Sequence, residues 1–165
     1  MNSKLASLPV VYLETTVVSY LAAKPSRDVV VAGHQQSTQE WWEYRRQDFR
    51  VVASQLVLQE AGGGDVQVAQ RRLDILQGVE LLEITPDATA LAHALVENAA
   101  IPKTSLEDAL HVAVAVVSRC TYLMTWNYRH LAGAGARARI EAFCRDKGYE
   151  PAIICTPEEL LEDAP

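Results

Sequence analysis

The stretch that decides the fold is VVYLETTVVSYL, which runs from Val10 to Leu21. Its first part is short, apolar and rich in β-branched and aromatic side chains, which predicts a buried strand over 9–13 that stops at Glu14. Thr15 or Thr16 can then cap a short helix that continues through Leu21. A strand that leads directly into a helix fits the first unit of a sheet covered by helices.

The chain goes on alternating between apolar runs and helical patterns until its end. Further strands are predicted over residues 49–53, 79–84, 122–125 and 152–155. The predicted helices cover 28–47, 55–61, 65–77, 106–118 and 135–147, and two more begin at Thr85 and Thr156. Strands that alternate with helices predict a three-layer α/β/α sandwich around a mainly parallel sheet, as one domain over residues 1–165.

The composition is that of an ordinary globular protein. Of the 165 residues, 49% are apolar and 22% are charged, a balance that suits one packed domain. No apolar run approaches the roughly 20 residues of a membrane helix, and residues 1–9 lack the apolar centre of a secretory signal. The three cysteines, Cys120, Cys144 and Cys155, are odd in number and not closely paired, so we expect reduced thiols in a cytoplasm.

The net charge of −6 bears differently on proteins that bind nucleic acid and on enzymes that cleave it. It counts against a protein that coats nucleic acid, because neutralising phosphates requires a basic surface. It counts less against an enzyme that cuts nucleic acid, because site carboxylates supply part of the charge and a bound cation offsets it. The basic pairs Arg45–Arg46 and Arg71–Arg72 and the stretch Arg137–Arg139 are interpreted as solvated helix faces rather than a substrate path.

Four polar residues that are far apart in the sequence form the candidate site. Glu14 and Asn127 follow predicted strands, and Glu60 and Asp108 lie in helical patterns. Parallel strands bring their carboxyl ends to one edge of a sheet, where sites form. Three carboxylates and an amide oxygen suit a hard cation such as Mg²⁺ or Mn²⁺. The leading hypothesis is therefore metal-assisted phosphodiester hydrolysis, although Glu14 could point to solvent and Glu60 is an ordinary helix residue.

Helix capping offers another explanation for Asp108 and Asn127. Ser105 with Asp108 matches a capping box, and Thr104 with Glu107 matches one equally well, so one of these pairs is expected to cap the helix. If Glu107 is the partner, Asp108 is free to face inward. Asn127 could be only the cap of the segment that follows it.

The histidines and the missing motifs narrow the chemistry. No His or Cys pair has zinc-finger spacing, so a structural zinc is not expected. His111 lies one turn after Asp108 and is expected to be a packed or surface residue rather than one that orients Asp108 or touches substrate. His130 could approach a phosphate. The sequence has no G-x-S-x-G and no phosphate-binding loop, which disfavours an acyl hydrolase and an NTPase, and no D-x-D follows the first strand, which disfavours an aspartyl phosphatase.

Three stretches, in this order, resemble the motifs of PIN-domain proteins: VYLETTVVSYL over 11–21, EDALHVAVA over 107–115 and YLMTWNYRH over 122–130. Their order and the chain length are most similar to the VapC-like toxins of type II toxin–antitoxin pairs. The resemblance implies an α/β/α sandwich and Mg²⁺- or Mn²⁺-dependent endoribonuclease activity. It maps the acidic site onto Glu14, Glu60, Asp108 and Asn127.

The resemblance also implies supporting residues and partners. Thr16 and Thr125 match positions where the family places a small hydroxyl beside the acidic cluster. The expected partners are RNA as substrate, a cognate antitoxin and a second copy in a homodimer, with no membrane. The antitoxin would lie near the early helices and point a basic side chain at the carboxylates. The helix that carries Trp41 and Trp42 is a candidate for that groove or for the dimer contact, and the two tryptophans are expected to be core or interface anchors.

Two residues depart from the family pattern. Glu14 stands where Asp is usual, and the neutral Asn127 stands where Asp is frequent. Three charges favour a single Mg²⁺ that retains several waters. The alternative hypothesis is a catalytically weak or inactive PIN-like module that acts by binding protein or RNA.

Overall fold

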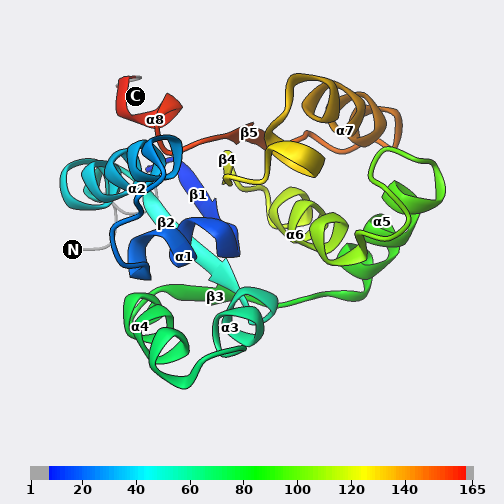
Figure 1. Ribbon diagram of the computed structural model, residues 1–165. Helices are drawn as coiled ribbons and strands as arrows, with labels where there is room; N and C mark the ends of the chain where they lie inside the picture. The colour runs from blue at the N-terminus through cyan, green and yellow to red at the C-terminus, as the bar shows by residue number, and fades with distance from the viewer. Residues whose placement is uncertain (1–7, 163–165) are drawn as a thin grey trace.

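The computed structural model describes residues 8–162, and its centre is a sheet of five parallel strands. The strands, in the order β3-β2-β1-β4-β5 across the sheet, are β3 (Glu80–Leu82), β2 (Arg50–Ser54), β1 (Val10–Leu13), β4 (Tyr122–Met124) and β5 (Ile153–Cys155) (Figure 1). Every neighbouring pair is parallel. The prediction of a parallel α/β sheet is confirmed.

Helices cover both faces of the sheet (Figure 1). They are α1 (Thr15–Ala22), α2 (Val29–Glu40), α3 (Gln55–Ala61), α4 (Val66–Leu76), α5 (Pro86–Glu97), α6 (Leu106–Val117), α7 (Ala134–Asp146) and α8 (Glu159–Glu162). α1, α3 and α4 gather on one side, and α5, α6 and α7 on the other. This placement follows from right-handed crossovers, because the chain moves one way across the sheet from β1 to β3 and the other way from β4 to β5. The three-layer sandwich is confirmed.

The strand order creates a switch point between β1 and β4. From β1 the chain continues to β2 and β3 on one side, whereas β4 and β5 occupy the other side. Leu13 pairs with Met124, and the backbone N–H of Glu14 donates to the Met124 carbonyl at 3.0 Å. The residues that follow these two strands are therefore neighbours, at the position where ligands bind in open α/β sheets.

The predicted helix over 28–47 is in fact three segments. α2 ends at Glu40, a π-helical turn covers Trp41–Arg45, and a 3₁₀ turn covers Arg46–Asp48. The wider π turn changes the angular position of each later residue. Tyr44, three residues after the buried Trp41, is exposed. The predicted segment is therefore helical, but it is not one regular α-helix.

Hydroxyl side chains cap two of the helices. The Ser54 hydroxyl accepts from the Val57 N–H, and the Thr85 hydroxyl accepts from the Ala88 N–H in front of Pro86. The first helix differs, because Glu14 caps α1, where Thr15 or Thr16 was expected. A carboxylate at a helix N-terminus meets unpaired N–H groups and the positive end of the helix dipole.

The three cysteines are buried free thiols. Burial raises the pKa of Cys144 to about 11 and that of Cys155 to about 12, so both stay protonated at neutral pH. Protonated, buried thiols are inert packing residues. Within residues 8–162, every helix is too short or too polar to cross a bilayer.

Candidate metal centre

Glu14 lies at the junction of β1 and α1, with only 4% of its surface exposed. Three groups donate to its Oε2 atom: the Thr16 N–H at 3.1 Å, the Thr16 hydroxyl, and the Thr125 hydroxyl at 2.8 Å. The other oxygen, Oε1, accepts no hydrogen bond from residues 8–162. The side chain is therefore held by one oxygen, which leaves the second oxygen for a ligand.

Glu60 lies in the last turn of α3, and its carboxylate, like that of Glu14, is held by neighbouring side chains. It accepts from the Thr15 hydroxyl and faces His111 Nε2, which is 3.2 Å from Oε1 and 3.3 Å from Oε2. Burial raises the pKa of Glu60, but the hydrogen bond and charge of His111, together with Thr15, outweigh it and hold the pKa below its usual range. Glu60 is therefore ionised at neutral pH.

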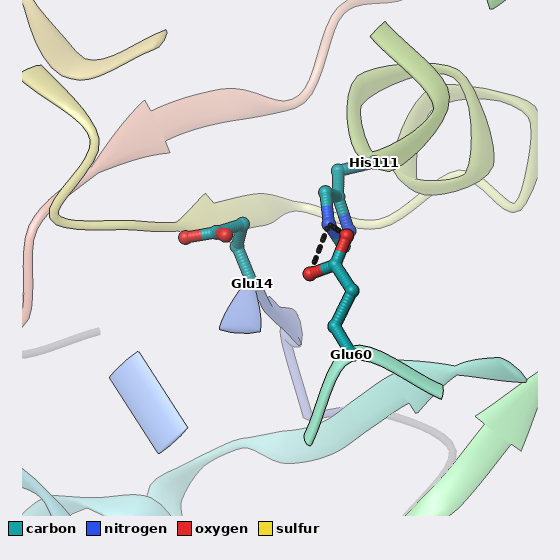
Figure 2. A group of neighbouring side chains, drawn as sticks. All are labelled: Glu14, Glu60 and His111. Atoms are coloured by element: carbon teal, nitrogen blue, oxygen red, sulfur yellow. Dashed lines mark hydrogen bonds and ion pairs between the residues drawn. The ribbon is translucent and has the colours of Figure 1, made fainter. Parts of the chain in front are cut away.

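His111 completes this group from the inner face of α6. Figure 2 shows Glu60 and His111 facing each other, with Glu14 beside them. One potential ligand atom from each of the three residues lies within 4.8 Å of the other two. Tyr12 contacts the same imidazole, with its hydroxyl 2.8 Å from Nδ1, and burial raises the pKa of Tyr12 so that it remains a phenol.

Asp108 and Asn127 form a neighbouring group. The Asn127 side-chain amide donates to Asp108 Oδ1 at 3.1 Å, and His130 Nδ1 lies 2.7 Å from Asp108 Oδ2. Asn127 also caps the π turn that follows it, because its Oδ1 accepts from the His130 N–H at 3.0 Å. Ser105 makes no cap bond to α6, and its hydroxyl lies 3.1 Å from His130 Nδ1 instead. The predicted capping box of Ser105 with Asp108 is therefore wrong, and the Asp108 carboxylate contacts Asn127 and His130 instead.

The Thr125 hydroxyl joins the two groups. It donates to Glu14 Oε2 at 2.8 Å and accepts from the Asn127 N–H at 3.0 Å. Because Asn127 holds Asp108, only two residues separate the carboxylates of Glu14 and Asp108 along a chain of hydrogen bonds. Thr16 and Thr125 thus contact the acidic residue that they were expected to support.

The structure arranges the four predicted site residues as two adjoining pairs. Glu14 and Glu60 lie together with His111, and Asp108 lies with Asn127. His111 was expected to be a packed or surface residue; it is buried, and its carboxylate partner is Glu60. The only signal for this contact in the sequence was a polar residue on the apolar face of the clearest helix. Whether these residues act in catalysis stays a prediction.

A pocket of about 610 Å³ opens beside the carboxylates. Glu14, Glu60, Tyr20, Lys24 and Trp126 line it together with residues of α1 and α2. Lys24 is exposed and forms no ion pair with the described residues. A cation at the rim of an anionic pocket suits a ligand that carries phosphate.

The residues present fit a hard divalent cation. Such ions take oxygen ligands and keep several waters. Glu14 offers the unbonded Oε1, and Glu60 offers further lone pairs on both oxygens beside it. Asp108 lies in the adjoining pair, where its two oxygens contact Asn127 and His130.

Gly133 ends the π turn that places His130 against Asp108. A Cβ atom at this position would lie 2.5 Å from the Tyr128 carbonyl oxygen, so the backbone would have to move. We expect Gly133→Ala to lower the free energy of unfolding by about 1–3 kcal/mol, as overpacking does. Denaturant unfolding measures this loss.

The matched control for that variant is Gly33→Ala in the middle of α2. Nothing lies within 4 Å of the added Cβ there, so the change should stabilise the protein by about 0.5–1 kcal/mol. Equal stability of Gly133→Ala and the parent protein would contradict the close contact with Tyr128.

The order of the five parallel strands, with helices on both faces, is that of a PIN-like α/β/α fold, as the sequence resemblance implied. The same fold occurs in a chain of the crystal structure of VapBC2 from Rickettsia felis bound to a DNA fragment from their promoter. The match has a TM-score of 0.57 and covers 89% of this chain and 98% of that chain. The two sequences are 17% identical, so the likeness shows the fold, and activity has to be argued from the site. No family model and no curated protein matches the sequence.

Proposed function

We propose that this protein is a metal-dependent endoribonuclease of the VapC-like kind that hydrolyses RNA phosphodiester bonds. The observation that carries the proposal is the convergence of Glu14 and Glu60, from two different helix–strand units, at the switch point of a PIN-like sheet. Two ionised carboxylates with potential ligand atoms within 4.8 Å of each other repel. A cation bound between them would remove this repulsion.

Each residue has a role in this proposal. Glu14 and Glu60 would bind Mg²⁺ or Mn²⁺, and Asp108 would bind or orient a coordinated water, with Asn127 holding Asp108 in place. When bound, such a cation lowers the pKa of water and offsets the charge of the attacked phosphate. Thr16 and Thr125 keep the Glu14 carboxylate fixed, which avoids reorganisation during the reaction.

The substrate would be single-stranded or looped RNA. A flexible backbone can bend so that one phosphate reaches the carboxylates, whereas the phosphates of a regular helix cannot enter a recessed site. Lys24 would contact a flanking phosphate at the rim of the pocket.

Metal removal tests the proposal. The purified protein should bind Mn²⁺ saturably in calorimetry and should cleave single-stranded RNA only when Mn²⁺ or Mg²⁺ is present. Treatment with EDTA should stop cleavage, and added Mn²⁺ should restore it. Cleavage that survives EDTA would refute the metal-dependent mechanism.

We also propose a cytoplasmic protein with an antitoxin partner and a homodimeric state. Trp41 is fully buried, which fits a core anchor, so it does not itself line a groove or a dimer contact. Trp42 remains available, because it is half-buried under the Arg46 guanidinium, 4.5 Å from the ring centroid. Co-expression with the product of the neighbouring gene should give a stable complex, and a lone monomer would count against both partners.

The alternative is a PIN-like module with weak or no activity. It is favoured by the position of Asp108, whose two oxygens are taken by Asn127 and His130 rather than by the Glu14–Glu60 group. A module of this kind would bind RNA or protein without binding Mn²⁺ at millimolar concentration. The calorimetric experiment therefore separates the two functions.

A further inference from the structure

The buried imidazole of His111 has hydrogen-bond partners on both nitrogens. Only 1% of its surface is exposed, Nδ1 lies 2.8 Å from the Tyr12 hydroxyl, and Nε2 faces both oxygens of Glu60. We infer that Tyr12 and His111 are positioning residues that hold Glu60 in the orientation used at the metal centre. This inference rests on the proposed function.

The partners of the imidazole decide where its proton lies. An ionised carboxylate only accepts hydrogen bonds, so Nε2 must carry a proton to bond with Glu60. The Tyr12 hydroxyl can either donate or accept. It donates to Nδ1 when His111 is neutral, and it accepts from Nδ1 when His111 is charged. The bond from Nε2 to Glu60 is therefore present in both states, and the inference does not depend on the charge of His111.

The network continues from Tyr12 into the centre of the sheet. The Tyr12 hydroxyl also lies 2.8 Å from the Ser54 hydroxyl, which caps α3 by accepting from the Val57 N–H. Glu60 lies near the other end of the same helix. The network thus connects the start of α3 to its catalytic end through β1 and α6, and the buried Tyr12 ring cannot move without disturbing the core.

Glu60 depends on this support because its side chain is long. Among the described residues, only Thr15 and His111 hold its carboxylate. Fixing a free Glu side chain costs rotamer entropy, and the network meets this cost before a ligand binds. Outer residues that orient a metal ligand typically change metal affinity or activity by about 10–100-fold.

The proton on Nε2 argues against His111 as a metal ligand. Its distance from Glu14 and Glu60 alone would allow that role. A nitrogen that carries a proton has no lone pair for a cation. His111 can bind the ion only if it gives up the bond with Glu60. The two roles are therefore mutually exclusive and can be told apart.

Tyr12→Phe tests the hydrogen-bond network of Tyr12, His111 and Glu60 by removing a single oxygen atom. We expect Mn²⁺ affinity to weaken about 10-fold in calorimetry, and kcat for RNA cleavage to fall while KM stays the same. The matched control is Tyr122→Phe in β4, which removes a hydroxyl that bonds to none of the described residues. A Tyr12→Phe variant with unchanged Mn²⁺ affinity would overturn the inference.

Two replacements of His111 keep the test valid if Tyr12→Phe does not fold. Gln has an amide that can still donate to Glu60, whereas Leu fills the space without a donor. We expect His111→Gln to retain Mn²⁺ affinity much closer to the parent than His111→Leu. Equal losses in both variants would show that His111 acts as a ligand or only as a packing residue.

The tautomer of His111 gives a readout that needs no metal and no activity. In ¹H–¹⁵N NMR of the parent protein, Nε2 should be protonated, both without metal and after addition of Mg²⁺. A neutral His111 ring protonated only on Nδ1 would overturn the inference, because its Nε2 could not donate to Glu60. A parent protein that binds no Mn²⁺ would instead refute the metal centre. The tautomer would still show whether His111 donates to Glu60.

Discussion

Glu14→Gln is expected to lower Mn²⁺-dependent RNA cleavage by about 100-fold or more, beyond the loss typical of outer residues. Gln has nearly the same shape as Glu, and its side-chain oxygen can still cap α1 by accepting from the Thr16 N–H. The variant should therefore fold, but it lacks the negative charge at the centre of the site. Single-turnover cleavage of labelled single-stranded RNA measures the loss, and calorimetry should show weaker Mn²⁺ binding.

Glu14→Asp serves as the companion variant. It introduces the residue that is usual at this position in the PIN-domain proteins that the sequence resembles, but its shorter side chain moves the carboxylate away from Thr125, which lies 2.8 Å from Glu14 Oε2. Activity of Glu14→Asp above that of Glu14→Gln is expected, because the charge is kept. If Glu14→Gln cuts as well as the parent, Glu14 is only a helix cap.

Asp108→Asn is expected to reduce cleavage to the level of EDTA-treated protein while the fold stays intact. The new amide oxygen can still accept from the Asn127 side chain, so that contact survives. The charge that faces His130 at 2.7 Å is lost, and with it the third carboxylate of the site. Thermal melting should confirm folding, and the same RNA assay measures activity.

Mn²⁺ binding and RNA cleavage by Asp108→Asn, measured together, also distinguish two roles for Asp108. Normal Mn²⁺ binding without cleavage would place Asp108 beside the reacting phosphate rather than on the ion. Loss of both would place it among the ligands. Equal cleavage by variant and parent would mean that the activity comes from a contaminant or from another site.

The sequence predicts the layers and the edge of the sheet that carries the site because both depend on local patterns. VVYLETT contains a strand, a carboxylate and a helix start within seven residues, and residues 122–127 repeat the arrangement of strand and polar end. Once parallel pairing is inferred, Glu14 and Asn127 must lie near each other, as they do through Thr125.

The parts that the sequence could not predict depend on tertiary packing. WWEYR over 41–45 has ordinary helical residues, and nothing in it predicts a π turn. The contact between Glu60 and His111 joins residues 51 positions apart, from helices on opposite sides of the sheet. Only the packing of α3 and α6 around β1 brings these side chains together.

The outermost strands of the sheet, β3 and β5, have only three residues each. A strand this short exposes few unpaired backbone groups on its free edge, so it is a poor template for another chain. Two molecules that join by continuing the sheet from one to the next would gain few hydrogen bonds. The shape of the sheet thus guards against amyloid-like growth and leaves self-association to the helical surfaces.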